Sequence, residues 1–131
     1  MFVTDTHPLV WYTTAKYAQL SPKVLAVFQK ADAGESLIYV PAVVLWEIAL
    51  LEHLRKIQMK EKFGRWASAL LAKNGFAVVP LETSIISQSL GYNFNNDIFD
   101  KVIVATAADL EIPLITKDFA ITESNLVETY W

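Results

Sequence analysis

The sequence contains no cysteine, only four glycines and two histidines, and no long apolar run. The lack of cysteine excludes disulfides and thiolate ligands, and two histidines make a zinc site a poor interpretation. The longest uncharged apolar run, residues 37–46, is about half of the roughly 20 residues that a membrane helix needs. No basic segment typical of a signal peptide opens the chain. We therefore expect a cytoplasmic protein that does not insert into a membrane.

The scarcity of charge also limits the class of protein. Charged residues make up 19% of the 131 residues and apolar residues 53%, a length that indicates a single domain over residues 1–131. Such an apolar surplus in a small chain predicts that another chain covers part of the surface, so we expect a homodimer. The net charge of −3 argues against a nucleic-acid coat protein but not against an enzyme whose acids hold a metal ion.

Segments typical of strands and helices alternate along the chain. Strands are predicted at residues 2–5, 37–40, 76–79, 113–116 and 126–129, and helices at residues 7–13, 22–33, 42–53, 60–73, 83–90 and 97–110, with a loop at residues 91–96. This alternation predicts an α/β fold with a central parallel sheet of four to five strands flanked by helices. In such sheets, ligands bind beyond the carboxyl ends of the strands. No Walker-type or G-x-G-x-x-G loop supports a nucleotide cofactor.

Four carboxylates interrupt otherwise apolar segments. Asp5 and Asp118 follow predicted strands, whereas Glu47 and Asp100 lie in the first turns of predicted helices. A lone carboxylate in apolar surroundings is destabilising unless a positive partner meets it, and the chain has only 11 lysines and arginines. Because parallel strands end at one edge of the sheet, we expect these acids to converge there around Mg²⁺ or Mn²⁺. That arrangement suits a metal-dependent nuclease.

Four segments around these acids carry a family resemblance. They are residues 5–11, 44–49, 97–107 and 114–118. In this order and spacing they resemble the PIN-domain family, and within it the VapC-type toxins of type II bacterial toxin–antitoxin systems. The resemblance implies a PIN fold and Mg²⁺- or Mn²⁺-dependent endoribonuclease activity in which a metal-activated water cleaves RNA. It also implies inhibition by a cognate antitoxin encoded beside the toxin.

The resemblance also assigns roles to individual acids. Asp5, Glu47 and Asp100 match the first three family acids, which are direct metal ligands. Asp118 matches the fourth, which varies more and often acts through water. Asp97 matches the first acid of a D-P-F-D-R type motif, so the resemblance places it at the metal site as well.

Positions next to the acids follow the family less closely. Ile98 stands where proline is common in the family, and Lys101 stands where arginine is common. Thr6 and Thr116 match hydroxyl positions that the resemblance implies hold the acids or waters in place.

Structural interpretations of these acids stay open from the sequence alone. Asp5 and Asp97 are also suitable helix caps, and Asp118 is a suitable turn residue. Two other functions are also compatible with the pattern. One is a catalytically silent module whose acids bind basic residues of a partner. The other is a Mg²⁺-dependent phosphotransfer domain, which the absence of a D-x-D pattern after the first strand disfavours.

Several cationic and aromatic residues have two interpretations. Five of the 11 lysines and arginines fall within one 11-residue stretch: Arg55, Lys56, Lys60, Lys62 and Arg65. One interpretation is that they bind RNA phosphates, and the other is that they form the solvated face of a helix pair. For Lys117, one interpretation is that it attracts an RNA phosphate, and the other is that it is a solvated surface charge. His7 is best explained as packing beside the first helix. The four tryptophans are compatible with stacking on bases, but such residues more commonly pack in a core or interface. They are Trp11, Trp46, Trp66 and Trp131.

Overall fold

Five short strands form the centre of the computed structural model, which describes residues 1–131. The strands are β1 (Phe2–Thr4), β2 (Ile38–Pro41), β3 (Phe76–Val79), β4 (Leu114–Ile115) and β5 (Thr129–Tyr130). They pair in the order β3-β2-β1-β4-β5, and every pair is parallel. The α/β class and the parallel sheet of the sequence analysis are therefore confirmed.

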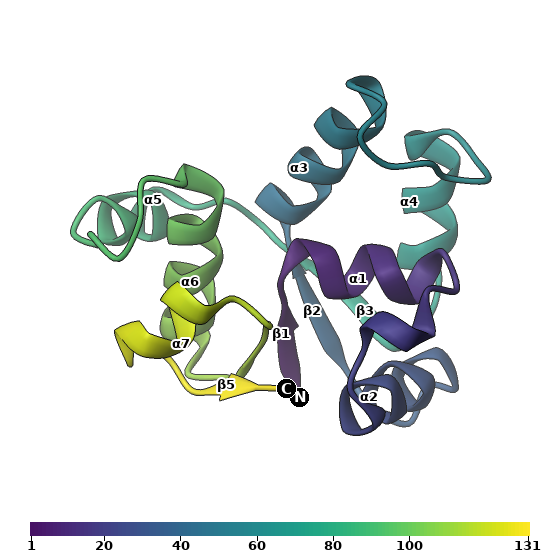
Figure 1. The fold of residues 1–131 in the computed structure, drawn as a ribbon, viewed down its shortest axis with the longest axis horizontal. Coiled ribbons are helices and arrows are strands. Elements are labelled where there is room, and N and C mark those ends of the chain that lie inside the picture. Colours follow the sequence, from purple (N-terminus) through teal and green to yellow (C-terminus); the bar gives the residue numbers. More distant parts are fainter.

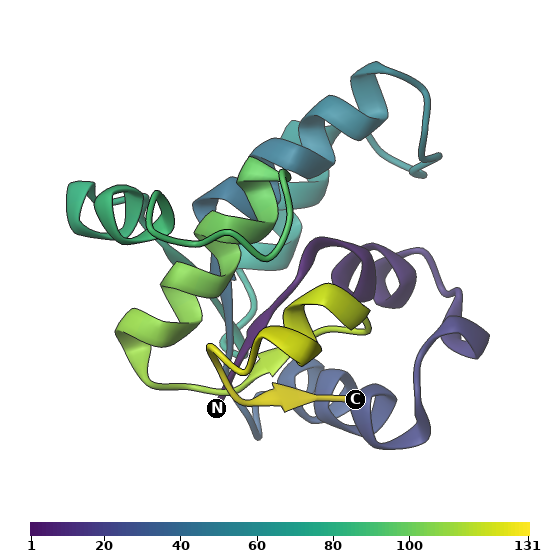
Figure 2. The ribbon, with the colours of Figure 1, turned by 60° about the vertical axis from the view of Figure 1, so that its left-hand side comes forward.

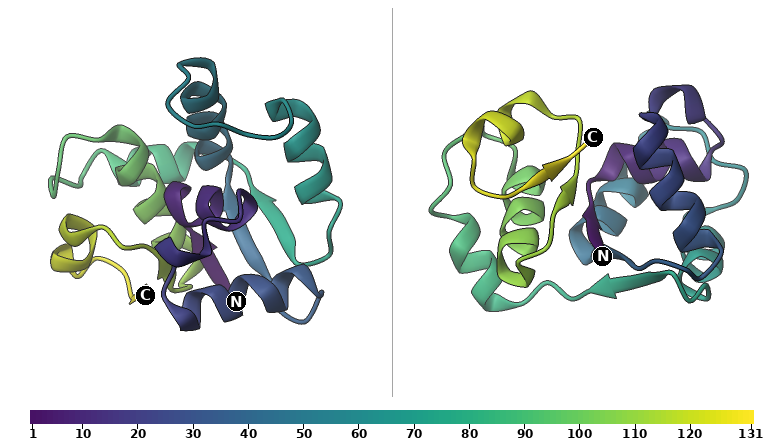
Figure 3. Two further views of the ribbon diagram at one scale, coloured as in Figure 1. Left: turned by 45° about the vertical axis from the view of Figure 1, so that its right-hand side comes forward. Right: turned by 90° about the horizontal axis from the view of Figure 1, so that it is seen from below.

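Helices surround this sheet on both sides of β1. They are α1 (Thr6–Thr13), α2 (Pro22–Asp32), α3 (Ala42–His53), α4 (Phe63–Leu71), α5 (Thr83–Ser89), α6 (Ile98–Leu110) and α7 (Phe119–Ser124), with a 3-10 turn η1 at Tyr17–Gln19. Figure 1 shows α5, α6 and α7 on one side of β1, and α1, α2 and α4 on the other. The view from below in Figure 3 shows β1 between the same two groups of helices. None of the helices is both long enough and apolar enough to cross a membrane.

The strands read as nearly continuous apolar runs because helices cover the sheet. Val3, Ile38 and Leu114 are all fully buried in one apolar core. Such runs are typical of parallel strands buried on both faces. The helices contribute apolar stripes of helical spacing, such as Val24 and Phe28 of α2, which are also fully buried.

The chain direction places the first turns of several helices at one edge of the sheet. In Figures 1 and 2 the N-terminal end of β1 lies at the bottom, and β1 runs upward into α1. Residue 41 ends β2 and residue 42 begins α3, so α3 also starts at the carboxyl end of its strand. α3 packs against both α1 and α6. We call this side of the molecule the carboxyl edge.

Several boundaries differ from the sequence predictions. α4 begins at Phe63 rather than at residue 60, and β5 comprises Thr129–Tyr130 instead of residues 126–129. α5 begins at Thr83, as predicted, and its N-cap residue Glu82 makes no side-chain hydrogen bond to the helix. α7 was not predicted at all. It has only six residues, fewer than two turns, which is too short to show an apolar periodicity.

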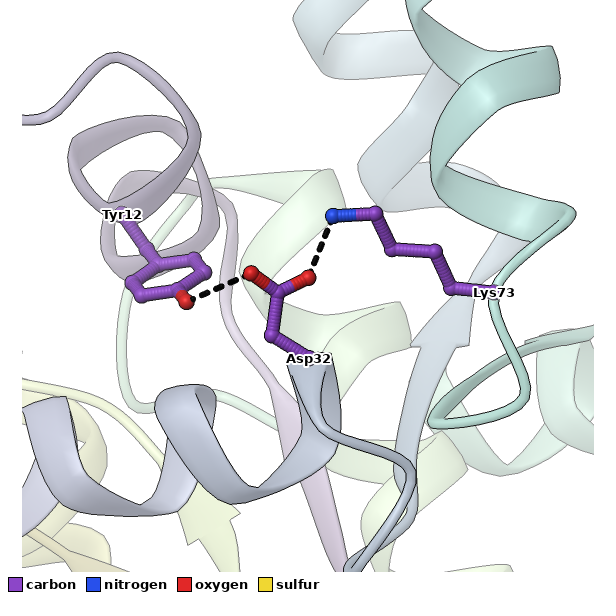
Figure 4. Close-up of polar contacts among 3 residues, drawn as sticks. All are labelled: Tyr12, Asp32 and Lys73. Atoms are coloured by element: carbon purple, nitrogen blue, oxygen red, sulfur yellow. Dashed lines mark hydrogen bonds and ion pairs between the residues drawn. The ribbon is translucent and has the colours of Figure 1, made fainter.

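A polar cluster joins three helices on the side of the sheet away from α6. Tyr12 of α1 donates its hydroxyl to Oδ2 of Asp32 at 3.0 Å, and the Lys73 ammonium, just beyond α4, pairs with Oδ1 of Asp32 (Figure 4). This Lys73–Asp32 contact is the only ion pair in the structure. The hydrogen bond from Lys73 holds the pKa of Asp32 below its ordinary value. We call these three residues the Asp32 cluster.

Candidate metal and nuclease site

All five acids selected from the sequence line one cavity at the carboxyl edge. The cavity has a volume of about 310 Å³ and is lined by Asp5, His7, Pro8, Trp11, Glu47, Asp97, Asp100, Lys117 and Asp118. We call it the acid cavity. Its lining comes from the segments after β1 and β4 and from the first two turns of α1, α3 and α6. The structure thus brings together residues that lie more than 100 positions apart in the sequence.

Asp5 is the only one of the five acids that is buried, with 8% of its surface exposed. It is the N-cap of α1, and its Oδ1 accepts a hydrogen bond from the backbone N–H of Thr6 at 2.7 Å. Its Oδ2 accepts from the hydroxyl of Thr116 at 2.7 Å. Burial raises the pKa of the Asp5 carboxyl above its ordinary value, and these two hydrogen bonds act in the opposite direction.

Glu47 is tied to the same helix start by a side-chain contact. The hydroxyl of Thr6 donates to Oε1 of Glu47, which connects α1 to the second turn of α3. Desolvation is the largest cause that raises the pKa of Glu47, and the negative charges of Asp97 and Asp5 raise it further. Thr6 and Thr116 therefore each donate a hydroxyl hydrogen bond to one of the acids.

Asp97 and Asp100 lie at the start of α6. Asp97 is the N-cap, and its Oδ1 accepts from the backbone N–H groups of Phe99 at 2.9 Å and Asp100 at 3.2 Å. Asp100 is half-buried, and its Oδ2 accepts from Nδ2 of Asn95 at 2.8 Å. Burial, followed by the charges of Asp5 and Asp97, raises the pKa of Asp100 to about 7.

Asp118 follows β4 and begins the unpredicted helix α7. Its Oδ1 accepts from the backbone N–H of Ile121 at 2.9 Å, so it caps this helix. Its own backbone N–H donates to the hydroxyl of Thr116 at 3.0 Å. Thr116 thus bonds to both Asp5 and Asp118, and it fixes the two acids that follow neighbouring parallel strands.

The electrostatics of the acid cavity are unbalanced. Five carboxylates line it, but Lys117 is the only lysine or arginine among the lining residues, and no ion pair is formed there. Burial is the largest cause of the raised pKa values of Asp5, Glu47 and Asp100, and neighbouring carboxylates raise them further. The charge of His7 lowers the pKa of Asp5 and of Glu47 but does not offset the burial. The cavity is therefore a place where added positive charge lowers the free energy of the folded protein.

The donor set fits a hard divalent cation. Mg²⁺ and Mn²⁺ prefer oxygen ligands, and the acid cavity offers carboxylate oxygens from five residues without cysteine. No three of the acidic or histidine side chains are arranged as a complete ligand group. Several of these carboxylates also accept hydrogen bonds from the protein, which hold them in place in the cavity.

Other lining residues were not selected as site residues from the sequence. His7 is exposed and lines the acid cavity, with its ring 5.7 Å from that of Trp11. Asn95 holds Asp100 but lies in a loop whose asparagines carry no signal for this contact. The basic stretch of residues 55–65 does not line the acid cavity, and several of its residues line a separate cavity beyond the end of α3.

Comparisons with known proteins identify the family. The family model of the PIN domain matches residues 2–123. No curated protein matches the chain. Among solved structures, the Mycobacterium tuberculosis toxin VapC20, which cleaves the sarcin–ricin loop, is similar with a TM-score of 0.69 and 15% identity, and 98% of each chain is covered.

Two further solved structures contain chains of the same fold. VapBC2 from Rickettsia felis, bound to a promoter DNA fragment, gives a TM-score of 0.67 at 14% identity, with 98% of this chain and 96% of that chain covered. FitAcB from Neisseria gonorrhoeae gives 0.65 at 19% identity, with 100% and 97% covered. The family match over nearly the whole length, together with the parallel sheet and its acidic carboxyl edge, shows that this chain belongs to the PIN-domain family.

Proposed function

We propose that this chain is a toxin endoribonuclease of the VapC type, which hydrolyses RNA phosphodiester bonds with Mg²⁺ or Mn²⁺ and is neutralised by a cognate antitoxin. The observation that carries the proposal is the convergence of five carboxylates in one cavity, without a paired cation, in a member of the PIN-domain family. The sarcin–ricin loop activity of the similar toxin VapC20 supports RNA as the substrate class.

The site residues divide by what each can do. Asp5, Glu47 and Asp100 would hold the metal, and Asp118 and Asp97 would complete the pocket. A bound Mg²⁺ or Mn²⁺ supplies the charge that activates a water nucleophile and offsets negative charge on the phosphodiester. Through their hydrogen bonds, Thr6 orients Glu47, Thr116 orients Asp5 and Asn95 orients Asp100.

The decisive experiment compares two neutralising substitutions on α6. RNA 5′ ends are mapped across the transcriptome of a bacterial host after brief expression of wild type, Asp100→Asn or Asp109→Asn. Asp109 is exposed on the same helix and does not line the acid cavity, so it controls for the loss of one charge. We expect discrete new ends with wild type and Asp109→Asn, and a loss of at least about 100-fold with Asp100→Asn.

A purified-protein assay completes this test. Cleavage of the RNA found in the host should require Mg²⁺ or Mn²⁺ and stop with EDTA. Equal cleavage by wild type and Asp100→Asn would contradict the proposed site, and a base-labile phosphoenzyme would instead identify a phosphotransfer domain.

A catalytically silent binding module is the second candidate. The observation that favours it is the lack of a complete three-residue ligand group in the structure. In that function the acid cavity would bind arginine or lysine side chains of a partner. Unchanged RNA and unchanged thermal stability on adding Mg²⁺ or Mn²⁺ would support this candidate over the nuclease.

The antitoxin is expected on a groove away from the acid cavity. Two cavities between α1 and the segment that leads into α4 share Thr13, Glu61 and Trp66, and their other lining residues include Tyr12 and Tyr17. This mixed aromatic and polar groove fits an amphipathic partner segment. Similar chains are found in VapBC2 and FitAcB complexes. Co-purification of the product of the adjacent gene, together with loss of RNA cleavage, tests the pairing.

A second copy of the chain is expected on α3 and α6. Trp46 and Leu50 of α3 and its C-cap residue Leu54 follow one another at helical spacing and are 57%, 37% and 59% exposed. Trp46 contacts Phe99, and the adjacent Ile98 is 65% exposed. An apolar stripe of this kind on a small chain is typical of an interface. Leu54→Glu should convert a dimer into a monomer in sedimentation experiments.

A further inference from the structure

One wall of the acid cavity is aromatic and carries a single ammonium group. Trp11, from α1, lines the cavity, and its ring lies 6.2 Å from the ring of Trp131 in an edge-on arrangement. The Nζ atom of Lys117 lies 5.9 Å from the centre of the Trp11 ring and 5.8 Å from that of Trp131. Lys117 is exposed, and both indoles are half-buried.

The ammonium group of Lys117 has no anionic partner within the protein. Lys117 lines a cavity with five carboxylates and is adjacent to Asp118, yet it forms no ion pair. Its only recorded partners are the two indoles, and both distances are near the outer limit of about 6 Å for a cation–π contact. Such a contact is weak at an exposed position, whereas a charge-assisted hydrogen bond to phosphate is strong. A phosphate oxygen in the cavity would therefore draw Lys117 away from the indoles.

We propose that Trp11 and Lys117 form the nucleotide-binding wall of the site, where Lys117 binds a phosphate next to the scissile bond and the adjacent base stacks on the indole of Trp11. This inference rests on the proposed ribonuclease function. When Lys117 moves to the phosphate, it leaves the indole face on which the base stacks. Stacking requires an unpaired base, so the wall selects single-stranded or looped RNA. Every base offers a π-face, so the wall itself discriminates little between sequences.

The test measures binding as well as cleavage. Fluorescence anisotropy follows a short labelled single-stranded RNA of randomised sequence, in parallel with an abasic sugar–phosphate oligomer of equal length. Ca²⁺ replaces Mg²⁺ during binding, and a gel checks that the RNA stays intact. Trp11→Leu should weaken RNA binding roughly 5- to 100-fold and leave the abasic oligomer unaffected. Trp11→Tyr should restore most of the RNA affinity because it restores an aromatic face.

Lys117 is tested by the salt dependence of binding. Lys117→Gln should weaken binding of both probes and reduce the slope of log K against log salt by about 0.7, the value for one phosphate contact on a single strand. Lys117→Arg should keep the slope of the wild type. Lys23→Gln is the matched control, because Lys23 lies 4.4 Å from the centre of the Tyr130 ring and does not line the acid cavity. It should leave both binding curves unchanged.

The outcomes separate this inference from the proposed function. Thermal unfolding verifies that each variant is folded. Equal losses of affinity for RNA and for the abasic oligomer with Trp11→Leu would contradict the proposed nucleotide-binding wall, and so would an unchanged salt slope with Lys117→Gln. Metal-dependent RNA cleavage by wild type would in either case still support the ribonuclease function. Failure of wild type both to bind and to cleave RNA would overturn both.

Discussion

The carboxylates of the acid cavity and the carboxylate of the Asp32 cluster lie in opposite electrostatic environments. In the Asp32 cluster one carboxylate has an ammonium and a phenol as partners, and its pKa is lowered mainly by Lys73. In the acid cavity five carboxylates have hydrogen-bond donors but no ion-pair partner, and the pKa of Asp100 is raised to about 7, mainly by burial. Both are assembled from residues far apart in the sequence.

Because of this difference, the Asp32 cluster stabilises the fold, whereas the acid cavity is suited to binding a cation. The Asp32 cluster is satisfied by the protein itself, so it joins α1, α2 and the end of α4 and needs nothing further. The acid cavity keeps ionised groups in a partly buried place where they repel one another, which lowers stability until a cation binds. Strongly raised pKa values in a cavity are typical of functional sites for this reason. Variants in each of the two regions should therefore differ in their effect on unfolding.

The largest effect is expected next to the Asp32 cluster. A Cβ added at Gly75 would lie 1.8 Å from the backbone oxygen of Ala31, and the carbonyl of Gly75 also accepts from Ile38 at 2.8 Å. Gly75→Ala must therefore displace α2 from the sheet, and we expect a loss of about 3 kcal/mol in urea unfolding. Gly64→Ala is the control, because nothing lies within 4 Å of its added Cβ and it is in a helix. Equal unfolding midpoints for the two variants would contradict this packing.

A divalent cation should have the next largest effect, now at the acid cavity. Because a ligand that binds only the folded state stabilises it, Mn²⁺ at 100 times its dissociation constant should add about 2.7 kcal/mol to the free energy of unfolding. Glu47→Gln should remove most of this gain, and Glu61→Gln, an exposed control away from the cavity, should keep it. The same gain in all three proteins would show that the cation binds elsewhere.

The sequence was sufficient to predict where the acids meet. Asp5 and Asp118 directly follow apolar segments, and strand direction then places them at one edge regardless of side-chain detail. The sequence offered Asp97 as a helix cap beside its metal-site role, and the structure shows it at the N-cap of α6, because N-caps depend on local sequence.

What could not be predicted depends on contacts between distant residues. The position of Lys117 over Trp11 and Trp131 is one example, because no local pattern specifies it. The hydrogen bond from Asn95 to Asp100 spans only five residues but requires a particular loop conformation. Neither periodicity nor composition encodes such a conformation.

A smaller effect is expected when the pH rises, because ionisation of Asp100 should lower the stability of the folded protein. The pKa of Asp100 is about 7 in the folded protein and 3.8 in a model compound, so the folded state binds this proton more tightly. Its contribution is fully present below pH 3.8 and is lost as the pH rises through 7. In EDTA, Asp100→Asn should therefore become more stable than wild type by about 1–2 kcal/mol between pH 4 and pH 8, a value reduced because the carboxyl is partly exposed.

Asp109→Asn serves as the control for this pH series. It removes an exposed charge from the same helix and should unfold like wild type over the same range. A stability difference between Asp100→Asn and wild type that stays constant with pH would show that the acid cavity does not perturb Asp100.

The smallest effect is expected from the charge of the Asp32 cluster. Asp32→Asn keeps an acceptor for Tyr12 and removes only the ion pair with Lys73, whose side chain is 46% exposed. Exposed pairs contribute up to about 1 kcal/mol, and salt screens them. The loss should be largest at neutral pH and low salt, and it should vanish as the pH falls through the lowered pKa of Asp32, because protonation of wild type breaks the same pair.

A double-mutant cycle isolates this pair. Urea unfolding of Asp32→Asn, Lys73→Gln and the double variant gives a coupling free energy that should shrink toward zero in 1 M NaCl, where the Debye length is about 3 Å. A coupling that survives high salt would mean that Asp32 and Lys73 act through hydrogen-bond geometry rather than charge. In that case the two regions would differ less than their pKa values indicate, and pairing alone would not explain why one carboxylate stabilises the fold while the others raise its free energy.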